Sequence, residues 1–112
     1  MTWHRHKFNA VAVGHDGYRF DSKAEGRYYE ELKLRCLPGG DVLFFLRQVP
    51  FFIAAPSTHA KSKPLKYVVD FLEFHRDGTV HFVDVKGMET KEFKIKKRLV
   101  EAQYPVKIEL VK

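Results

Sequence analysis

Two aspartates and one lysine stand inside otherwise apolar segments of the sequence. Asp70 follows two valines, while Asp84 and Lys86 alternate with valines in a segment typical of a β-strand. Because successive side chains of a strand point to opposite faces, Asp84 and Lys86 would share one face and the two valines the other. Charged groups inside a strand are costly unless they are paired, hydrated or bound to a metal ion. The pattern therefore predicts a compensating charge beside these residues.

The turn between the two segments decides whether Asp70 and Asp84 meet. A two-residue turn at Asp77 and Gly78 would place the two carboxylates on opposite faces of the hairpin. A three-residue loop over 76–78, with Gly78 in a left-handed conformation, would place Asp70 directly opposite Asp84. Like charges in that position repel each other unless a divalent cation lies between them. The sequence alone leaves both registers open.

If the two carboxylates are close, the set suits phosphodiester chemistry. Paired carboxylates favour Mg²⁺ or Mn²⁺, which also coordinates a substrate phosphate and acidifies a bound water. The ammonium group of Lys86 would orient the attacking water or stabilise the charge that develops on the scissile phosphate. These residue types therefore predict metal-dependent hydrolysis of a phosphodiester bond.

Glu25 is a further acidic candidate, because it lies on the apolar stripe of a predicted helix over residues 22–36. Two interpretations of it stay open. In a capping box, the Glu25 side chain would return to the backbone N–H of Ser22 and have only a structural role. Alternatively, Glu25 would face the two aspartates. A single aspartate in a strand has a similar structural alternative, as an edge or solvent-facing residue.

The remaining pattern predicts the elements that position these groups. Residues 1–17 are interpreted as an extended arm with a turn at 15–17, and Pro50 marks an edge strand or a bulge. The predicted elements are a helix at 22–36, a strand at 42–53, paired strands at 65–74 and 80–87, a helix at 90–103 and a strand at 106–111. This α-β-β-β-α-β order predicts one α/β domain over residues 1–112, with a mixed sheet flanked by helices.

The charge balance favours a polyanionic partner. The formal net charge is +6, and 30% of the residues are charged. No apolar run approaches the ~20 residues of a membrane span, and the N-terminus has no export signal pattern. The single cysteine, Cys36, agrees with a reducing compartment. We therefore expect a cytoplasmic protein with no membrane partner and no small-molecule cofactor.

Two short motifs carry a resemblance to a known superfamily. The segment VVD ends at Asp70, and VDVKG contains Asp84 and Lys86, in the α-β-β-β-α-β order given above. This arrangement resembles the PD-(D/E)XK nucleases. With FDSKAEGRYYEELK at 20–33, it is similar to the small phage-encoded Holliday junction resolvases of that superfamily. The sequence departs from the motif's name at one position, because Val69 stands in place of the proline.

The resemblance implies a restriction-endonuclease-like fold and a set of roles. Asp70 and Asp84 would coordinate Mg²⁺ with help from the backbone carbonyl of Val85. Lys86 would be the catalytic lysine, and Glu25 would complete the acidic set and is an additional candidate ligand. The resemblance also implies a homodimer that cuts two opposed strands of a four-way DNA junction, in the cytoplasm of the host cell if the protein is phage-encoded.

Further residues are expected to support the site or to contact DNA. Ser22 and Gln48 are candidates to contact the metal ligands rather than the ion. Positively charged side chains are expected to bind phosphates, which fix position rather than read sequence. They are Lys61, Lys63, Lys66, Lys91, Lys94, Lys97 and Arg98.

The sequence thus predicts a Mg²⁺-dependent or Mn²⁺-dependent endonuclease that resolves Holliday junctions. The first alternative is a nuclease of the same superfamily that acts on linear or single-stranded DNA. The second is a noncatalytic nucleic-acid-binding module, in which the lysines matter and the carboxylates do not. The third is an interaction protein with a phenylalanine-rich face over 44–53. A buried core strand is the other interpretation of that segment.

Overall fold

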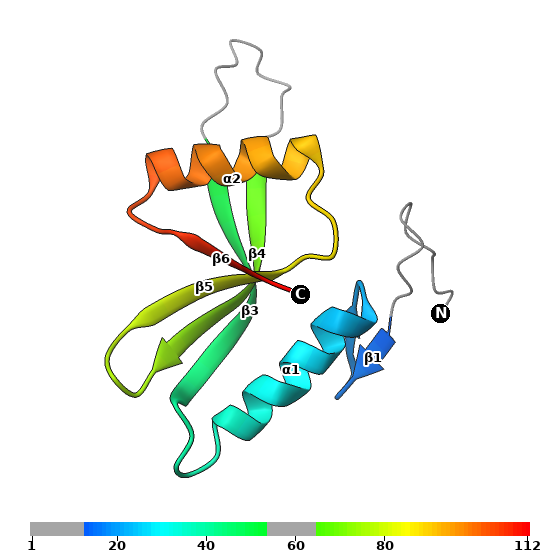
Figure 1. Cartoon of the computed structure of the whole chain (residues 1–112), viewed down its shortest axis with the longest axis vertical. Helices are drawn as coiled ribbons and strands as arrows, with labels where there is room; N and C mark the ends of the chain where they lie inside the picture. The colour runs from blue at the N-terminus through cyan, green and yellow to red at the C-terminus, as the bar shows by residue number, and fades with distance from the viewer. Residues whose placement is uncertain (1–12, 54–64) are drawn as a thin grey trace.

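The computed structural model describes residues 13–53 and 65–112, and within them it contains two helices and six strands. The order predicted from the sequence, α-β-β-β-α-β, is confirmed, and a small hairpin precedes it (Figure 1). The elements are β1 (Val13–His15), β2 (Tyr18–Phe20), α1 (Lys23–Arg35), β3 (Val42–Ile53), β4 (Leu65–His75), β5 (Val80–Val85), α2 (Lys91–Gln103) and β6 (Ile108–Val111).

The main sheet has four strands in the order β3-β4-β5-β6. The pairs β3–β4 and β4–β5 are antiparallel, whereas β5 and β6 are parallel and are connected through α2. This arrangement confirms the predicted α/β fold with a mixed sheet. Pro50 lies on β3, which is an edge strand. Because no strand pairs with the outer side of β3, the sheet tolerates a residue without an N–H there.

The turn predicted at 15–17 is confirmed, but the segment before it is not an unpaired arm, because residues 13–15 pair with residues 18–20 in the β1–β2 hairpin. His15 pairs with Tyr18, so the turn contains only Asp16 and Gly17. Both turn residues have positive φ, 51° and 80°, as the two-residue turns that match strand twist require. The first part of the predicted arm, residues 1–12, lies outside the described residues.

Both helices begin where their capping residues predict. The Ser22 hydroxyl accepts a hydrogen bond from the Glu25 amide at 3.1 Å, and the Thr90 hydroxyl accepts one from the Phe93 amide at 3.1 Å. After α1, Cys36 caps the last turn, and the chain passes through two glycines to β3. Neither helix of the described residues is long and apolar enough to cross a membrane.

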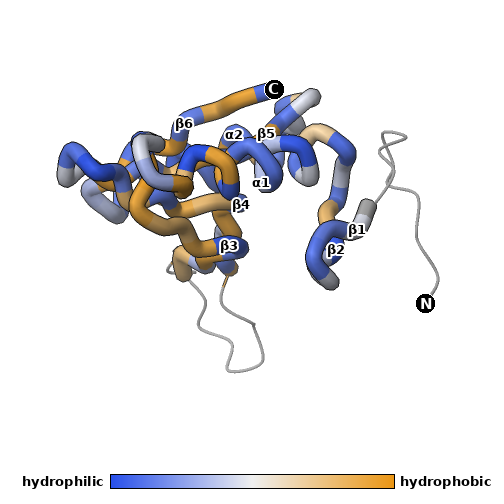
Figure 2. The backbone as a smooth tube through the Cα atoms, turned by 90° about the horizontal axis from the view of Figure 1, so that it is seen from below, coloured by the Kyte–Doolittle hydropathy of each residue, from blue (hydrophilic) through white to orange (hydrophobic). Residues whose placement is uncertain are grey.

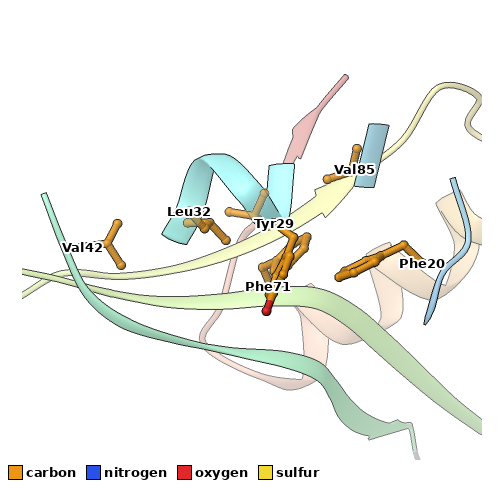
Figure 3. Packing of buried hydrophobic residues seen from close by; sticks show 7 residues of the cluster. Phe20, Tyr29, Leu32, Val42, Phe71 and Val85 are labelled. Atoms are coloured by element: carbon orange, nitrogen blue, oxygen red, sulfur yellow. The ribbon is translucent and has the colours of Figure 1, made fainter. Parts of the chain in front are cut away.

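The helices cover different parts of the long strands β3 and β4 (Figure 1). Tyr29 and Leu32 of α1 pack with Val42 and Phe71 in one buried cluster, which is seen from close by in Figure 3. The second cluster lies beneath α2 and consists of Ile53, Tyr67, Val69, Val100 and Ile108. The hydrophobic segments of the chain follow these strands, whereas the β1–β2 hairpin is largely hydrophilic (Figure 2).

A buried glutamate connects α1 to the sheet. Glu73 of β4 is 1% exposed, and its Oε2 accepts a hydrogen bond from the Tyr28 hydroxyl at 2.5 Å. Its Oε1 lies 2.8 Å from Nε2 of His75, and Arg35 is 3.6 Å away. These contacts provide hydrogen bonds and a positive charge for the buried Glu73 carboxylate. Its burial is therefore explained by its role in connecting α1 to the sheet.

Strand β4 passes from one cluster to the other at a single residue. Val69 belongs to the cluster under α2, and Phe71 belongs to the cluster under α1. Asp70 lies between them. The fold therefore places this carboxylate at the boundary between the two halves of the core.

Candidate active site

The hairpin of β4 and β5 has the three-residue loop. The His75 amide donates to the Thr79 carbonyl at 2.9 Å, so these residues close the loop over 76–78. Gly78 has a φ of 89°, which is the left-handed conformation that such a loop needs. The sequence left two registers open, and the structure selects this one.

This register brings the two aspartates together. Phe71 pairs with Val83, and the next position along each strand places Asp70 opposite Asp84. The two side chains bond to backbone amides across the hairpin. The Asp70 amide donates to Oδ1 of Asp84 at 2.8 Å, and the Val85 amide donates to Oδ2 of Asp70 at 2.9 Å. Backbone amides of β4 and β5 thus fix the orientation of both aspartate side chains.

A tyrosine that the sequence analysis did not single out completes the contacts of Asp84. The Tyr67 hydroxyl donates a hydrogen bond to Oδ2 of Asp84. Asp84 is 1% exposed, whereas Asp70 is only half-buried. Asp84 is therefore fixed from within the core, and Asp70 is the more accessible member of the pair.

Burial governs the acidity of the pair. It raises the pKa of the Asp70 carboxyl and of the Asp84 carboxyl above the usual range. Backbone hydrogen bonds and the positive charge of Lys86 lower both pKa values, but they do not offset the burial. Two negative charges at this position are consequently unfavourable unless a further positive charge is present.

Lys86 lies on the side of β5 that the alternation predicts. Val83 and Val85 belong to the cluster under α1, as expected for the opposite face. The Lys86 ammonium nitrogen lies 4.9 Å from the centroid of the Phe93 ring of α2, within the range of a cation–π contact. Asp84 and Lys86 are therefore both turned toward the side of the sheet that α2 covers.

Glu25 is buried, with 4% of its surface exposed. Its Oε2 accepts a hydrogen bond from the Asp21 amide at 3.3 Å, so the predicted return to the Ser22 amide is wrong by one residue. Its Oε1 accepts a hydrogen bond from Nε2 of Gln48 at 3.2 Å. Burial, followed by the negative charge of Asp70, raises the pKa of Glu25 to about 7. Ser22 itself caps α1.

Gln48 connects Glu25 to Asp70. Its neighbours on β3 pair with the neighbours of Asp70 on β4, and its side chain is hydrogen-bonded to Asp70. Gln48 has a φ of 53°, which is strained for a residue with a Cβ and costs on the order of 1 kcal/mol. Such strain is concentrated at functional sites. Gln48 therefore contacts two of the candidate acids, and its role at a metal site stays a prediction.

The structure does not gather all three acids around one point. In the described part of the chain, no three histidine, cysteine, aspartate or glutamate side chains are placed to hold a metal ion together. Gln48 lies between Glu25 and Asp70, so the predicted place of Glu25 as a metal ligand is not supported by its contacts. Asp70 and Asp84 remain as a pair. The role expected of the Val85 carbonyl stays a prediction.

A basic cleft lies between the start of β4 and the first turns of α2. Neither aspartate lines it, and it is related to the aspartate pair through Tyr67 and Lys86. Its volume is about 630 Å³. Three lysines line it, Lys66, Lys86 and Lys96, together with Tyr67 and Phe93. Lys96 forms an ion pair with Glu92 at 3.1 Å. The cleft thus leads from the surface of α2 to the tyrosine that contacts Asp84.

Four of the seven basic residues expected to contact DNA do not line this cleft. Lys66 lines the cleft, but Lys61 and Lys63 lie outside the described residues. Four basic residues of α2 are absent from the cleft lining, and they are Lys91, Lys94, Lys97 and Arg98. Lys97 pairs with Glu101 at 3.2 Å. Lys96 lines the cleft but was not among the residues predicted to contact DNA. It lies three residues after Phe93, so the two side chains share one face of α2.

Tyr67→Phe should show how strongly the tyrosine supports Asp84. Removing the hydroxyl leaves a buried carboxylate oxygen with one partner fewer, and we expect a loss of roughly 1–3 kcal/mol in the free energy of unfolding. Urea denaturation at pH 7.5 measures it. Tyr104→Phe is the matched control, because its hydroxyl bonds the Phe52 carbonyl at an exposed site. Equal losses in the two variants would mean that Asp84 does not depend on Tyr67.

The fold and the site define a small mixed α/β domain with a carboxylate pair beside a basic cleft. Residues 5–111 match the family described as "Protein of unknown function (DUF1064)". The chain therefore belongs to the DUF1064 family. A search of the curated proteins found no match.

Proposed function

We propose that this protein is a Mg²⁺-dependent or Mn²⁺-dependent endonuclease that cuts four-way DNA junctions, similar to the Holliday junction resolvases of the PD-(D/E)XK superfamily. One observation carries the proposal. Asp70 and Asp84 lie opposite each other on adjacent strands, and Lys86 follows on the same side, at a basic cleft. This set suits metal-dependent hydrolysis of a phosphodiester bond.

The aspartate pair fits a hard divalent cation. Mg²⁺ is usually held by one or two carboxylates, and waters and substrate phosphates complete its shell. Each carboxylate oxygen has two lone pairs, so the hydrogen bonds from Val85 and Tyr67 leave acceptor capacity on Asp70 and Asp84. The raised pKa values of the pair are a further reason to expect a cation. When bound, it would supply Lewis-acid charge and make a nearby water more acidic.

The residues of the chain would act on the DNA itself. Lys86 would donate to the scissile phosphate, or orient the attacking water, from its place beside the pair. Lys66 and Lys96 would hold the strand in the cleft through its phosphates. Tyr67 would keep Asp84 in one orientation. Gln48 would do the same for Asp70, and Glu25 would act through Gln48 as a positioning residue.

A homodimer is part of the proposal, because paired incision of a junction needs two sites related by a two-fold axis. Strand β3 offers support for self-association. It is an edge strand, and four of its apolar side chains are about half exposed, namely Leu43, Phe44, Leu46 and Phe52. Exposed apolar edges are surfaces on which a second chain commonly docks.

The test is cleavage of a synthetic four-way junction beside linear, flapped and single-stranded DNA, with Mg²⁺ and with EDTA. We expect symmetric cuts in the junction only, and only with Mg²⁺. Asp84→Asn is the matched control, because it keeps the side-chain volume and removes one charge of the pair. We expect it to bind the junction but not to cut it.

Two other outcomes would change the proposal. Equal cleavage of every substrate, lost in Asp84→Asn, would keep the metal-dependent nuclease and discard the junction selectivity. Tight, salt-sensitive binding with no cleavage would favour the noncatalytic binding module, which the absence of a three-ligand cluster among the described residues also fits.

A further inference from the structure

A second cleft lies between β2, α1 and β3. Its volume is about 410 Å³, and its lining residues are Tyr18, Tyr29, Phe45, Leu46 and Arg47. Neither aspartate of the pair lines it. The volume falls in the range of pockets that hold small ligands. Aromatic rings and one cation therefore define a separate place at which a ligand fits.

Arg47 is held in an unusual setting. Its guanidinium carbon lies 4.6 Å from the centroid of the Tyr18 ring and 4.3 Å from that of the Phe20 ring. Both distances are within the range of cation–π contacts. The Arg47 Nε is buried and has no hydrogen-bond partner among the described residues. Because the Nε is buried, an anionic ligand would reach the guanidinium only through its terminal nitrogens.

The cleft is connected to the acidic residues through consecutive positions of β3. Arg47 precedes Gln48, and Gln48 contacts both Glu25 and Asp70. The positive charge of Arg47 is felt at Glu25, where it acts to lower the pKa. A ligand bound to Arg47 would therefore lie near Gln48 and Glu25.

The lining indicates the chemistry of the ligand. A guanidinium donates strong hydrogen bonds to phosphate oxygens. Tyr18 is 50% exposed, so part of its ring is accessible to a planar group. Nucleobases stack on such rings only when they are not stacked and paired in a duplex. A nucleotide of an unpaired strand offers both a phosphate for the Arg47 guanidinium and a base for the Tyr18 ring.

We propose that this cleft binds one nucleotide of an unpaired DNA segment, with its phosphate on Arg47 and its base stacked on Tyr18. The inference rests on the proposed function in taking DNA as the ligand. At a four-way junction, such a base is available only where a nucleotide is unpaired at the branch point, because fully paired arms offer no free base. The bound strand would then continue across Gln48 toward Asp70.

The test is binding of a fluorescent 12-nucleotide oligo-dT, measured by anisotropy in EDTA so that no cleavage occurs. We expect Tyr18→Leu and Arg47→Lys each to weaken binding roughly 5- to 100-fold, because a stacked base or a planar donor is lost. Binding of a blunt duplex should change by less than about twofold. Arg27→Lys is the matched control, since Arg27 is exposed on α1 and lines neither cleft.

Melting temperatures of all variants establish that they are folded. If Arg47→Lys does not fold, Tyr18→Leu decides, because half of the Tyr18 side chain already faces solvent. Folded variants that bind oligo-dT as tightly as the wild-type protein would overturn the inference, and so would a wild-type protein that does not bind oligo-dT. In that case the cation–π contacts of Arg47 serve only to pack β2 against β3.

This test is independent of cleavage. Junction cleavage by the wild-type protein, with oligo-dT binding unaffected by Tyr18→Leu, would keep the nuclease and reject this cleft. Oligo-dT binding that depends on Tyr18 and Arg47, with no cleavage of any substrate, would reject the nuclease and support the cleft.

Discussion

Lys86→Met is expected to lower the rate of junction cleavage by roughly 10²- to 10³-fold, the usual effect of removing one group that stabilises transition-state charge. The ammonium group of Lys86 lies beside the Phe93 ring and lines the cleft next to the aspartate pair. Methionine keeps most of the side-chain length and the contact with Phe93, so the fold should be retained. Single-turnover cleavage with saturating enzyme measures the rate.

A second measurement on the same variant separates chemistry from metal binding. The rise in melting temperature on adding Mg²⁺ should be the same in Lys86→Met as in the wild-type protein, because the aspartates are unchanged. Lys94→Met is the matched control, since Lys94 is exposed on α2 and does not line the cleft. A similar loss of rate in both variants would show that Lys86 contributes only general attraction for DNA.

In EDTA, the free energy of unfolding is expected to fall as the pH rises from about 4.5 to about 7. The cause is Glu25, whose pKa is raised in the folded protein from its ordinary value of 4.5 to about 7. Between these values the folded protein binds more protons than the unfolded chain, so its stability decreases with pH. The stabilisation is fully present below pH 4.5 and is lost as the pH rises through 7. A shift of this size corresponds to at most roughly 3 kcal/mol.

Urea denaturation at half-unit pH intervals measures this dependence. Glu25→Gln should flatten it, because glutamine keeps the hydrogen bond from Gln48 and does not ionise. Glu31→Gln is the control, since Glu31 is exposed on the same helix and should leave the slope unchanged. The raised pKa values of Asp70 and Asp84 act in the same direction, so a smaller slope should persist in Glu25→Gln. A slope identical to that of the wild-type protein would exclude Glu25 as its main cause.

The order of the elements was predictable because it depends on local signals. Ser22 and Thr90 satisfy the free amides at the helix starts, and both helices begin at the next residue. Apolar alternation identified the strands of the mixed sheet. The β1–β2 hairpin was missed, although its turn was located, because strands of three residues carry too little alternation to be recognised.

The carboxylate pair was only half predictable. The sequence identified Asp70 and Asp84 as unusual, but two turn types were compatible with the loop after His75. The positive φ of Gly78 and the closure from His75 to Thr79 selected the register. A shift of one residue would have placed the two acids on opposite faces. Their meeting is therefore a property of the folded hairpin.

The surroundings of the pair could not be predicted, because they come from distant parts of the chain. Tyr67 reaches Asp84 across the hairpin, and Gln48 reaches both Glu25 and Asp70 from β3. Nothing in the local sequence distinguishes Arg47 from an exposed strand arginine, yet the fold buries its Nε. The contacts of these three side chains depend on how α1 and α2 pack on the sheet, which the local sequence does not specify.

By itself, the sequence determined the helices, the long strands and the residue types available for chemistry, because capping, alternation and charge act over a few neighbouring positions. Only the tertiary structure decided which aspartates lie opposite each other, that Glu25 is hydrogen-bonded to Gln48, and which lysines line a cleft. Hydrogen bonds across strands and packing between elements set these relations. Both depend on residues that are far apart in the chain.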